Sequence, residues 1–325
     1  MPAVTRQMRP HILLAAGVLA AVLLPVSSRA VHAQTAGRMQ VIFYNTENFF
    51  DCFHDSLKND HEFLPTGRRH WTWTRMEYKA ERIAKVLAAA GGMNTPALIG
   101  LCEVENRGCL SLLCRKMPDY HYKILHSESP DARGIDVALL YDPAQFAITD
   151  SAFLRVGDGT DLRTRDILYA SGATADGGTL HVFVCHLPSM LGGAKATEWK
   201  RQTAKNMLRQ RTDSILQQDW QARIIIMGDM NCPPKDDIAG MHNRMTDLQK
   251  KGIGTEKYKG RWTCLDQFYV SCAVDSVCEA AVFSPSWLSE QDEKHTGTRP
   301  KRTFKGFRYN QDGYSDHYPV ILLFR

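Results

Sequence analysis

Residues 223–231 read Arg-Ile-Ile-Ile-Met-Gly-Asp-Met-Asn, and this segment is the clearest guide to the architecture. Its short apolar run is rich in β-branched residues, which predicts a buried strand. The run stops at Gly228, and two polar side chains, Asp229 and Asn231, follow immediately. A buried strand that ends in chemically capable residues is typical of a layered α/β protein with a functional site on loops at one sheet edge.

Other segments of the chain extend this pattern. Six more apolar runs rich in Val, Ile, Phe and Tyr predict buried strands at 39–44, 97–103, 136–141, 180–187, 265–270 and 318–324. Apolar residues at helical spacing predict helices over 75–90 and 196–218. Residues 53–73 and 284–312 have weak periodicity and are predicted to be long loops, a class of segment that tends to carry function.

The N-terminus has the features of a secretory signal peptide. Arg6 and Arg9 precede an apolar run at 12–26, which is shorter than the roughly 20 residues that a permanent membrane span needs. Val31-His32-Ala33 predicts cleavage before Gln34, although an uncleaved anchor is the alternative. We therefore expect a signal peptide at 1–33 and a single exported domain at 34–325. That domain is expected in the periplasm or outside the cell, without stable membrane association or an obligate protein partner.

The charge of the chain neither requires nor excludes a polyanionic substrate. The full sequence has a formal net charge of +5, and removal of Arg6, Arg9 and Arg29 with the signal peptide leaves +2. A strong sequence-blind nucleic-acid binder would usually carry a larger basic excess.

Nine cysteines follow the predicted cleavage site. Cys102 and Cys185 lie in apolar runs and are predicted to be small buried hydrophobic residues. The pairs close enough in sequence to form bridges are Cys109/Cys114 and Cys272/Cys278. No cysteine or histidine spacing typical of a structural zinc site is present.

Six short segments at the ends of predicted strands carry the chemistry. They are Tyr44-Asn45-Thr46-Glu47-Asn48, Leu101-Cys102-Glu103-Val104-Glu105-Asn106, Val184-Cys185-His186-Leu187, Gly228-Asp229-Met230-Asn231, Leu265-Asp266-Gln267-Phe268 and Ser315-Asp316-His317-Tyr318-Pro319-Val320. Together they resemble the endonuclease/exonuclease/phosphatase superfamily over residues 39–325. The resemblance implies the fold of pancreatic-type deoxyribonuclease, an α/β four-layer sandwich with two packed mixed β-sheets flanked by helices.

The resemblance also implies hydrolysis of a phosphate ester with Mg²⁺ or Mn²⁺ as cofactor. Glu103 matches the leading metal ligand of the family, and Asn45 matches the asparagine that lies beside the metal. Asp229 and Asn231 match the pair that orients the attacking water and holds a phosphate oxygen, and Asp229 also belongs to the expected metal site. Asp316 matches the residue that completes the metal or histidine network. Such hard oxygen ligands suit these cations.

Alternatives to these roles come from the residues themselves. Glu103 could simply open the helix that follows it, but the apolar run before it argues for a buried position, and Glu105 and Asn106 suit the helix start better. Asn45 in isolation would more often be a turn residue. Its place in the set of six segments favours the metal site.

His186 and His317 are the candidates for general acid–base catalysis, since hydrolysis needs one proton acceptor and one proton donor. The resemblance supplies each histidine with a carboxylate, so Asp266 is expected to orient His317 and Asp136 is expected to pair with His186. Asp136 lies within an apolar run, where an unpaired carboxylate would pay a large desolvation penalty. This cost favours a paired, functional carboxylate.

Three further residues are candidates for substrate contacts. Arg165 could clamp a phosphate through its planar fork, or it could be a solvated charge at a strand edge. Trp71 and Trp73 could stack on a base or a sugar. We expect them instead to pack against the helix that begins near Arg75.

The family core implies the reaction but leaves the substrate open. A histidine at position 186 resembles the deoxyribonuclease and sphingomyelinase branches. We therefore expect a secreted nuclease-like hydrolase that acts on a phosphate ester, with nucleic acid among the candidate substrates. The alternatives are a lipid or inositol-phosphate phosphodiesterase or phosphatase, and an inactive exported binding protein. Inactivity is disfavoured because every matched site residue is present.

Overall fold

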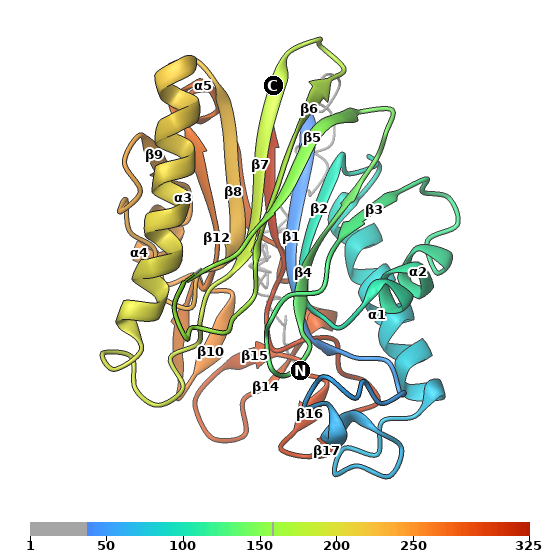
Figure 1. Cartoon of the computed structure of the whole chain (residues 1–325). Coiled ribbons are helices and arrows are strands. Elements are labelled where there is room, and N and C mark those ends of the chain that lie inside the picture. The colour runs from blue at the N-terminus through green and yellow to red at the C-terminus, as the bar shows by residue number, and fades with distance from the viewer. Residues whose placement is uncertain (1–37, 158) are drawn as a thin grey trace, which may run out of the picture. The chain divides into compact units, whose positions relative to one another are not determined.

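A computed structural model describes residues 38–157 and 159–325. The predicted signal peptide at 1–33 lies outside these residues. Two six-stranded sheets pack face to face, with helices on their outer surfaces (Figure 1). This arrangement confirms the predicted four-layer sandwich of two mixed sheets and helices.

The first sheet has the strand order β13-β18-β1-β2-β4-β3. Its strands are β1 (Met39–Phe49), β2 (Leu98–Val104), β3 (Lys123–His126), β4 (Asp136–Tyr141), β13 (Glu279–Val282) and β18 (Val320–Phe324). Strands β1 and β2 are parallel, whereas β4 and β18 run antiparallel to them. Helices α1 (Trp73–Gly91) and α2 (Arg107–Arg115) pack on the outer face of this sheet.

The second sheet has the order β5-β6-β7-β8-β12-β9. Its strands are β5 (Phe146–Leu154), β6 (Ile167–Thr174), β7 (Thr179–His186), β8 (Arg223–Asp229), β9 (Met241–Asn243) and β12 (Asp266–Ser271). Strands β7 and β8 are parallel, and β12 is antiparallel to β8. Helix α3 (Glu198–Gln218) covers the outer face, where Ala204 and Leu208 pack with Ile224 and Ile226.

Short elements complete the fold. They are α4 (Thr246–Lys250), α5 (Cys272–Asp275), β10 (Glu256–Tyr258), β11 (Arg261–Thr263), β14 (Ser289–Gln291), β15 (Thr298–Pro300), β16 (Phe304–Lys305), β17 (Arg308–Tyr309) and the 3₁₀ turns η3 (His61–Phe63) and η4 (Ser286–Leu288). The predicted loop at 53–73 contains only one such turn before α1 begins. The predicted loop at 284–312 holds two small hairpins, whose strands are too short to show a period of two.

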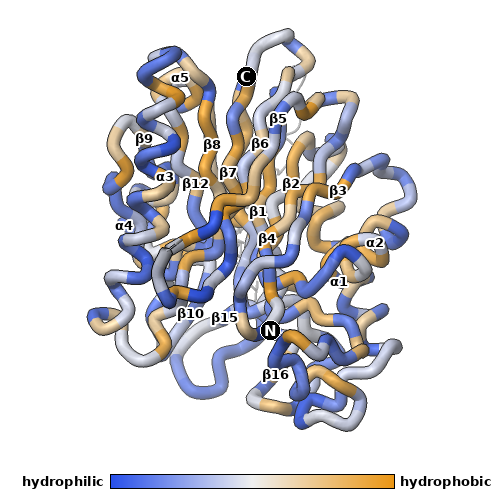
Figure 2. The backbone as a smooth tube through the Cα atoms, viewed as in Figure 1, coloured by the Kyte–Doolittle hydropathy of each residue, from blue (hydrophilic) through white to orange (hydrophobic). Residues whose placement is uncertain are grey.

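The main core lies between the two sheets. Val41 and Phe43 of the first sheet share it with Val182 and Val184 of the second. The alternate residues of β1, such as Ile42, face the helices instead. Figure 2 shows the apolar residues concentrated on the strands, as this double burial requires.

All seven predicted strands and both predicted helices are present, with small shifts at their ends. The short strands β3, β9 and β13 were not predicted from the sequence, and neither were β5 and β6, which form one side of the second sheet. Their polar and small residues, as in Ile167–Thr174, lack the apolar pattern of a central strand.

The cysteines are all free in this structure. Cys102 and Cys185 are buried, as predicted. The bridges considered at Cys109/Cys114 and Cys272/Cys278 are not formed. Cys109 and Cys114 lie five residues apart at α2, a spacing that points side chains to different sides of a helix. Among the described residues, no helix has the length and apolar character needed to cross a membrane.

Candidate active site

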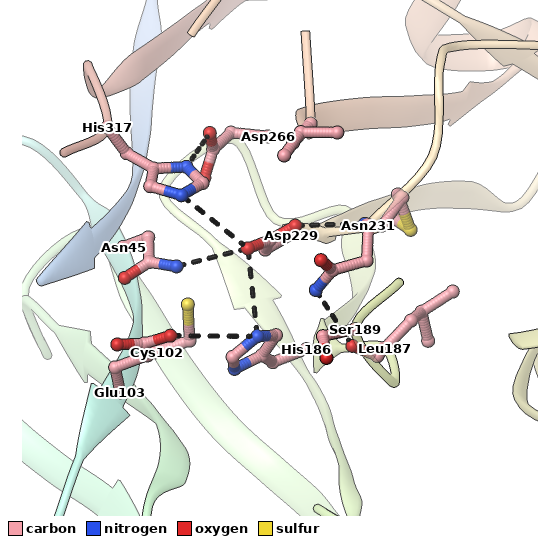
Figure 3. A network of polar contacts seen from close by, with 12 residues as sticks. Asn45, Cys102, Glu103, His186, Leu187, Ser189, Asp229, Asn231, Asp266 and His317 are labelled. Carbon is pink, nitrogen blue, oxygen red and sulfur yellow. Dashed lines mark hydrogen bonds and ion pairs between the residues drawn. The ribbon is translucent and has the colours of Figure 1, made fainter. Parts of the chain in front are cut away.

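Strand direction brings the chemically capable residues to one edge of the sandwich. The parallel strands β1 and β2 end at this edge, as do β7 and β8 in the second sheet. Strands β12 and β18 run antiparallel to their neighbours, so both begin there. Segments far apart in sequence therefore contribute side chains to the polar network in Figure 3.

The two-residue period of the strands then selects the inward-facing side chains. Val182 and Val184 face the inter-sheet core, and His186 continues the same face of β7. Asp229 follows Ile225 and Met227 in the same way on β8. Asn45 and Asp266 occupy the equivalent face of β1 and β12. The network is thus the polar end of the core between the sheets.

Glu103 reaches the site through a β-bulge. Along β2, Ile99 and Leu101 face the helices, and a regular strand would send Glu103 to that side as well. The register between β2 and β4 shifts between Cys102 and Val104, and Glu103 has a φ of 59°. A bulge redirects the side chain of its extra residue, and here the carboxylate accepts a hydrogen bond from Asn48 N at 2.9 Å.

Asp229 lies at the centre of the network. Its Oδ2 accepts from Asn45 Nδ2 at 3.0 Å, and its Oδ1 accepts from Asn231 N at 2.9 Å. The Nε2 atoms of His186 and His317 lie 3.6 and 4.0 Å from Oδ2. Burial raises the pKa of Asp229 to about 6, while the nearby His317 opposes this rise.

His317 and Asp266 form the pair that the sequence predicted. The ring Nδ1 donates to Asp266 Oδ2 at 2.6 Å, which leaves Nε2 facing Asp229. Burial lowers the pKa of His317, but the carboxylates of Asp266, Asp229 and Asp316 raise it by more. The resulting pKa lies well above the ordinary value, so this imidazole is well suited to carrying a proton.

His186 has a different environment. Its Nε2 lies 3.6 Å from Asp229 and 4.0 Å from Glu103 Oε1, and its buried Nδ1 has no hydrogen-bond partner. Burial, with the charges of Arg165 and Arg133 as further causes, holds the pKa of His186 well below its usual range. The two histidines of the site therefore have opposite protonation preferences.

The predicted pairing of Asp136 with His186 is wrong. No hydrogen bond or ion pair joins the two among the described residues. On β4, Asp136 shares a face with Ala138 and Leu140, which pack toward the helices, whereas His186 faces the other sheet. Asp136 instead accepts from Ser129 N at 3.0 Å, and burial raises its pKa to about 7.

Asn231 and Asp316 both border the network. Asn231, with a φ of 48°, turns the chain just after β8 and donates from Nδ2 to Leu187 O at 3.0 Å. Asp316 is half-buried, with Oδ1 3.9 Å from His317 Nε2 and Oδ2 3.5 Å from Arg302 Nη2. Both residues are therefore close enough to the histidines and to Asp229 to share one site with them.

Arg165 does not reach out as a phosphate clamp. Its buried guanidinium donates to the carbonyls of His186 and Leu187 at 3.2 and 2.9 Å, and to Asp131 Oδ2 at 3.1 Å. The alternative of a solvated strand-edge charge is wrong for the same reason. Arg165 positions the end of β7.

The two tryptophans also differ in environment. Trp71 is fully buried, donates to Phe50 O at 2.9 Å and packs on Phe63 and Phe304. This confirms a packing role, but these aromatic partners lie outside α1. Trp73 begins α1 and is exposed.

Two buried charged residues that were not predicted from the sequence, Glu47 and Lys79, both contact Thr303. Glu47 accepts from the backbone N–H groups of Thr303 and Phe304, and Lys79 donates to Thr303 Oγ1 and Tyr314 O. Burial raises the pKa of Glu47 to about 7 and lowers that of Lys79 to about 8. The signal in the sequence was Lys79 itself, a charged residue among the apolar positions of α1.

The donor set fits a hard divalent cation. Glu103, Asp229 and Asp316 supply carboxylate oxygens, the ligands that Mg²⁺ and Mn²⁺ prefer. Among the described residues, the ion-pair partners of Glu103 and Asp229 are the two histidines, with no Lys or Arg within 4.0 Å. Two neighbouring carboxylates without a permanent cation are the arrangement that a bound metal would balance.

Comparisons with known proteins agree with this fold. The model of the Endonuclease/Exonuclease/phosphatase family matches residues 40–325. A search of curated proteins gives no match. Truncated TDP2 from Caenorhabditis elegans is 15% identical, with a TM-score of 0.58 over 89% of this chain and 97% of that chain.

Two further solved structures share the fold. An endonuclease/exonuclease/phosphatase family protein from Bacteroides thetaiotaomicron is 15% identical, with a TM-score of 0.56 over 89% of this chain and 98% of that one. D. rerio TDP2 complexed with a single-strand DNA product is 16% identical, with a TM-score of 0.52 over 89% of this chain and all of that one, at 100%.

Proposed function

The chain belongs to the endonuclease/exonuclease/phosphatase family, whose members are metal-dependent hydrolases of phosphoester bonds, and on this premise we propose that it is an exported, nuclease-like phosphoesterase that uses Mg²⁺ or Mn²⁺. One observation carries the proposal. Two imidazoles with opposite protonation preferences approach the same carboxylate oxygen of Asp229, and Glu103 lies beside one of them.

Each residue of the site has a separate role in the proposed hydrolysis. Glu103 and Asp229 would hold the cation, with Asp316 at the edge of the site, and the bound cation neutralises charge on the phosphoryl oxygens. His186, whose ring is neutral, accepts the proton of the attacking water. His317, which Asp266 holds in one orientation, donates a proton to the leaving oxygen. Asn231 supplies a side-chain amide for a phosphoryl oxygen.

A basic cavity beside the site supports a nucleic-acid substrate. It has a volume of about 530 Å³ and reaches Arg302, which contacts Asp316. Six of its lining residues are Lys or Arg and two are acidic. Lys257, Arg299, Arg302 and Lys305 form ion pairs with carboxylates, so Lys259 and Lys294 are the basic residues that would attract a polyanion. Tyr258, which is exposed, also lines this cavity and offers a ring on which a base can stack. The DNA product bound by D. rerio TDP2 is consistent with this class of substrate.

The proposed substrate class is tested by an activity screen of the purified protein. The substrates are single-stranded and duplex DNA, RNA, sphingomyelin, inositol phosphates and a chromogenic phosphodiester, each with Mg²⁺, Mn²⁺ or EDTA. We expect metal-dependent cleavage of nucleic acid. Preferential turnover of the lipid or the inositol phosphates would replace the nuclease assignment, and full activity in EDTA would contradict the metal mechanism.

Glu103→Gln tests the site itself, because it removes a ligand charge with little change of volume. We expect it to retain the fold and lose most of the rate. Glu77→Gln, at a partly exposed position on α1, is the matched control and should behave as wild type. Equal activity of Glu103→Gln and wild type would remove Glu103 from the metal site.

Export is the part of the proposal that rests on residues 1–33. The apolar run at 12–26 and the Val31-His32-Ala33 sequence support it. Mass spectrometry of protein recovered outside the cytoplasm should find an N-terminus at Gln34 or within a few residues of it. An intact Met1 on membrane-bound protein would favour the anchor instead.

A further inference from the structure

A second group of metal-ligating side chains lies on the helix-facing side of the first sheet. His126 ends β3, Asp136 begins β4, and Glu128 lies on the connection between these strands. One ligand atom from each of the three lies within 4.8 Å of the other two. None of these residues contributes to the network around Asp229, which faces the opposite side of the sheet.

Two atoms of this cluster are buried without a hydrogen-bond partner. His126 Nε2 and Asp136 Oδ2 lie 3.9 Å apart, on side chains that are only 3% and 1% exposed. Unpartnered buried nitrogen and oxygen atoms are costly, and native structures usually satisfy them with protein, water or an ion. Because these two face each other, a single bound species can satisfy both.

The neighbouring charges do not fill this role. Asp136 uses its other oxygen, Oδ1, to accept from Ser129 N. The Lys58 ammonium is bonded to the carbonyls of Ser129 and Asp131, at 2.6 and 3.1 Å. Among the described residues, His126 is the sole ion-pair partner of Asp136.

We propose that His126, Glu128 and Asp136 bind a divalent transition-metal ion, with Zn²⁺ as the representative, at a site separate from the catalytic one. Bonds of about 2.0–2.2 Å to nitrogen and oxygen let one ion span up to roughly 4.3 Å, which accommodates the separation of His126 Nε2 and Asp136 Oδ2. Glu128 is exposed and lies beside Asp136, so its carboxylate can complete the set. The imidazole ligand favours such metals over Mg²⁺.

The site would tie the β3–β4 connection to the sheet. That connection carries Asp131, whose carboxylate bonds Arg165, and Arg165 in turn holds the carbonyls of His186 and Leu187. The second metal would therefore position the end of β7 through the connection without contacting the substrate.

The test is calorimetric titration of metal-free protein with Zn²⁺, in excess Mg²⁺ to occupy the oxygen-ligand site. Wild type should bind one equivalent of Zn²⁺. Glu128→Gln and His126→Ala should bind it at least 10–100-fold more weakly, because even residues that only hold a metal ligand in place contribute that much to metal affinity. Zn²⁺ should raise the melting temperature of wild type and not of these variants. With Co²⁺ as the probe, the visible absorption of wild type should be lost in His126→Ala.

Matched controls separate this site from others. His121→Ala removes an exposed histidine from the same segment and should bind Zn²⁺ as wild type does. Glu128→Gln changes an exposed side chain and keeps the test valid if His126→Ala does not fold. Wild-type binding by both cluster variants would overturn the proposal. Loss of Zn²⁺ binding in His61→Ala alone would also overturn it, because the zinc would then belong to the His54–Asp60–His61 group. Loss of Zn²⁺ binding in Glu103→Gln alone would assign the zinc to the catalytic site instead.

Discussion

At the scale of single residues, the site depends on how differently two histidines are held. Asp266 binds one ring at 2.6 Å and raises its pKa, whereas burial keeps the other ring neutral. Both rings share Asp229 Oδ2 as a neighbour. One carboxylate can thus align a proton donor and a proton acceptor on the same substrate.

We expect His186→Ala and His317→Ala each to lower kcat by about 10²- to 10⁴-fold, the usual cost of a lost general acid or base. The double variant should lose far less than the product of the two, because both act in one transition state. Steady-state kinetics of the single and double variants measure this. His181→Ala is the matched control, since His181 lies on β7 but bonds Tyr169 away from the site. A silent His186→Ala would leave the chemistry to His317.

Asp266→Asn should change the pH dependence of the reaction. The Asp266 carboxylate raises the pKa of His317, so its removal lowers that pKa. If protonated His317 is the acid, activity is lost as the pH rises through this pKa, and the alkaline limb of the pH–rate profile should move to lower pH in the variant. Asp275→Asn, which removes the partner of Arg244, should leave the profile unchanged. An unshifted limb in Asp266→Asn would contradict the role of this pair.

At the scale of elements, the connection from β2 to α2 brings the carboxylates of Glu105 and Asp51 close together. Asn106 caps α2 by accepting from Cys109 N and also donates to Asp51, while Glu105 accepts from Asp51 N at 2.7 Å. Burial raises the pKa of Glu105 to about 8, well above its ordinary 4.5. Glu105 therefore either stays protonated in the folded state, or its buried charge lowers the free energy of unfolding.

The sign of the resulting pH dependence follows from linkage. The folded state holds the Glu105 proton more tightly than the unfolded state, so this contribution is complete below about pH 4.5 and is lost as the pH rises to about 8. Glu105→Gln removes the titration. We expect the stability of the variant relative to wild type to increase by on the order of 1–3 kcal/mol between pH 5 and pH 8. Urea unfolding in EDTA measures this, and a pH-independent difference would show that Glu105 is ionised throughout.

At the scale of the whole molecule, stability depends on the core shared by the two sheets. Phe268 of β12 is fully buried there with Phe43 and Val184. Asp266 of the site lies two residues before Phe268 on the same strand. Packing of the sheets and alignment of the site are therefore parts of one structure.

Phe268→Ala should cost about 3–5 kcal/mol of unfolding free energy, the range for removing a large buried ring. Phe53→Ala is the matched control because this ring is 65% exposed, and its effect should stay within about 0.5 kcal/mol. Denaturant unfolding of both variants provides the comparison. Similar losses for the two would mean that the inter-sheet core does not dominate stability.

Local pattern was enough to predict much of this protein. Runs such as 223–228 are recognisable because a strand buried on both faces must be continuously apolar. The polar residues at predicted strand ends also matched the family's motifs, so the resemblance placed Asn45, Asp229 and the pair of Asp266 and His317 in one site. Their positions follow from chain direction and from the period of two, which are local properties.

Other features were decided by tertiary structure alone. Glu103 faces the site because of a bulge, and Asp136 faces away because the register of β4 puts it on the helix side. The Arg165 guanidinium donates to the backbone carbonyls of His186 and Leu187 at the end of β7, so it does not face the substrate. In each case the alternatives differ by which face or partner a side chain meets. That choice is set by pairing between distant strands, which the sequence near the residue does not encode.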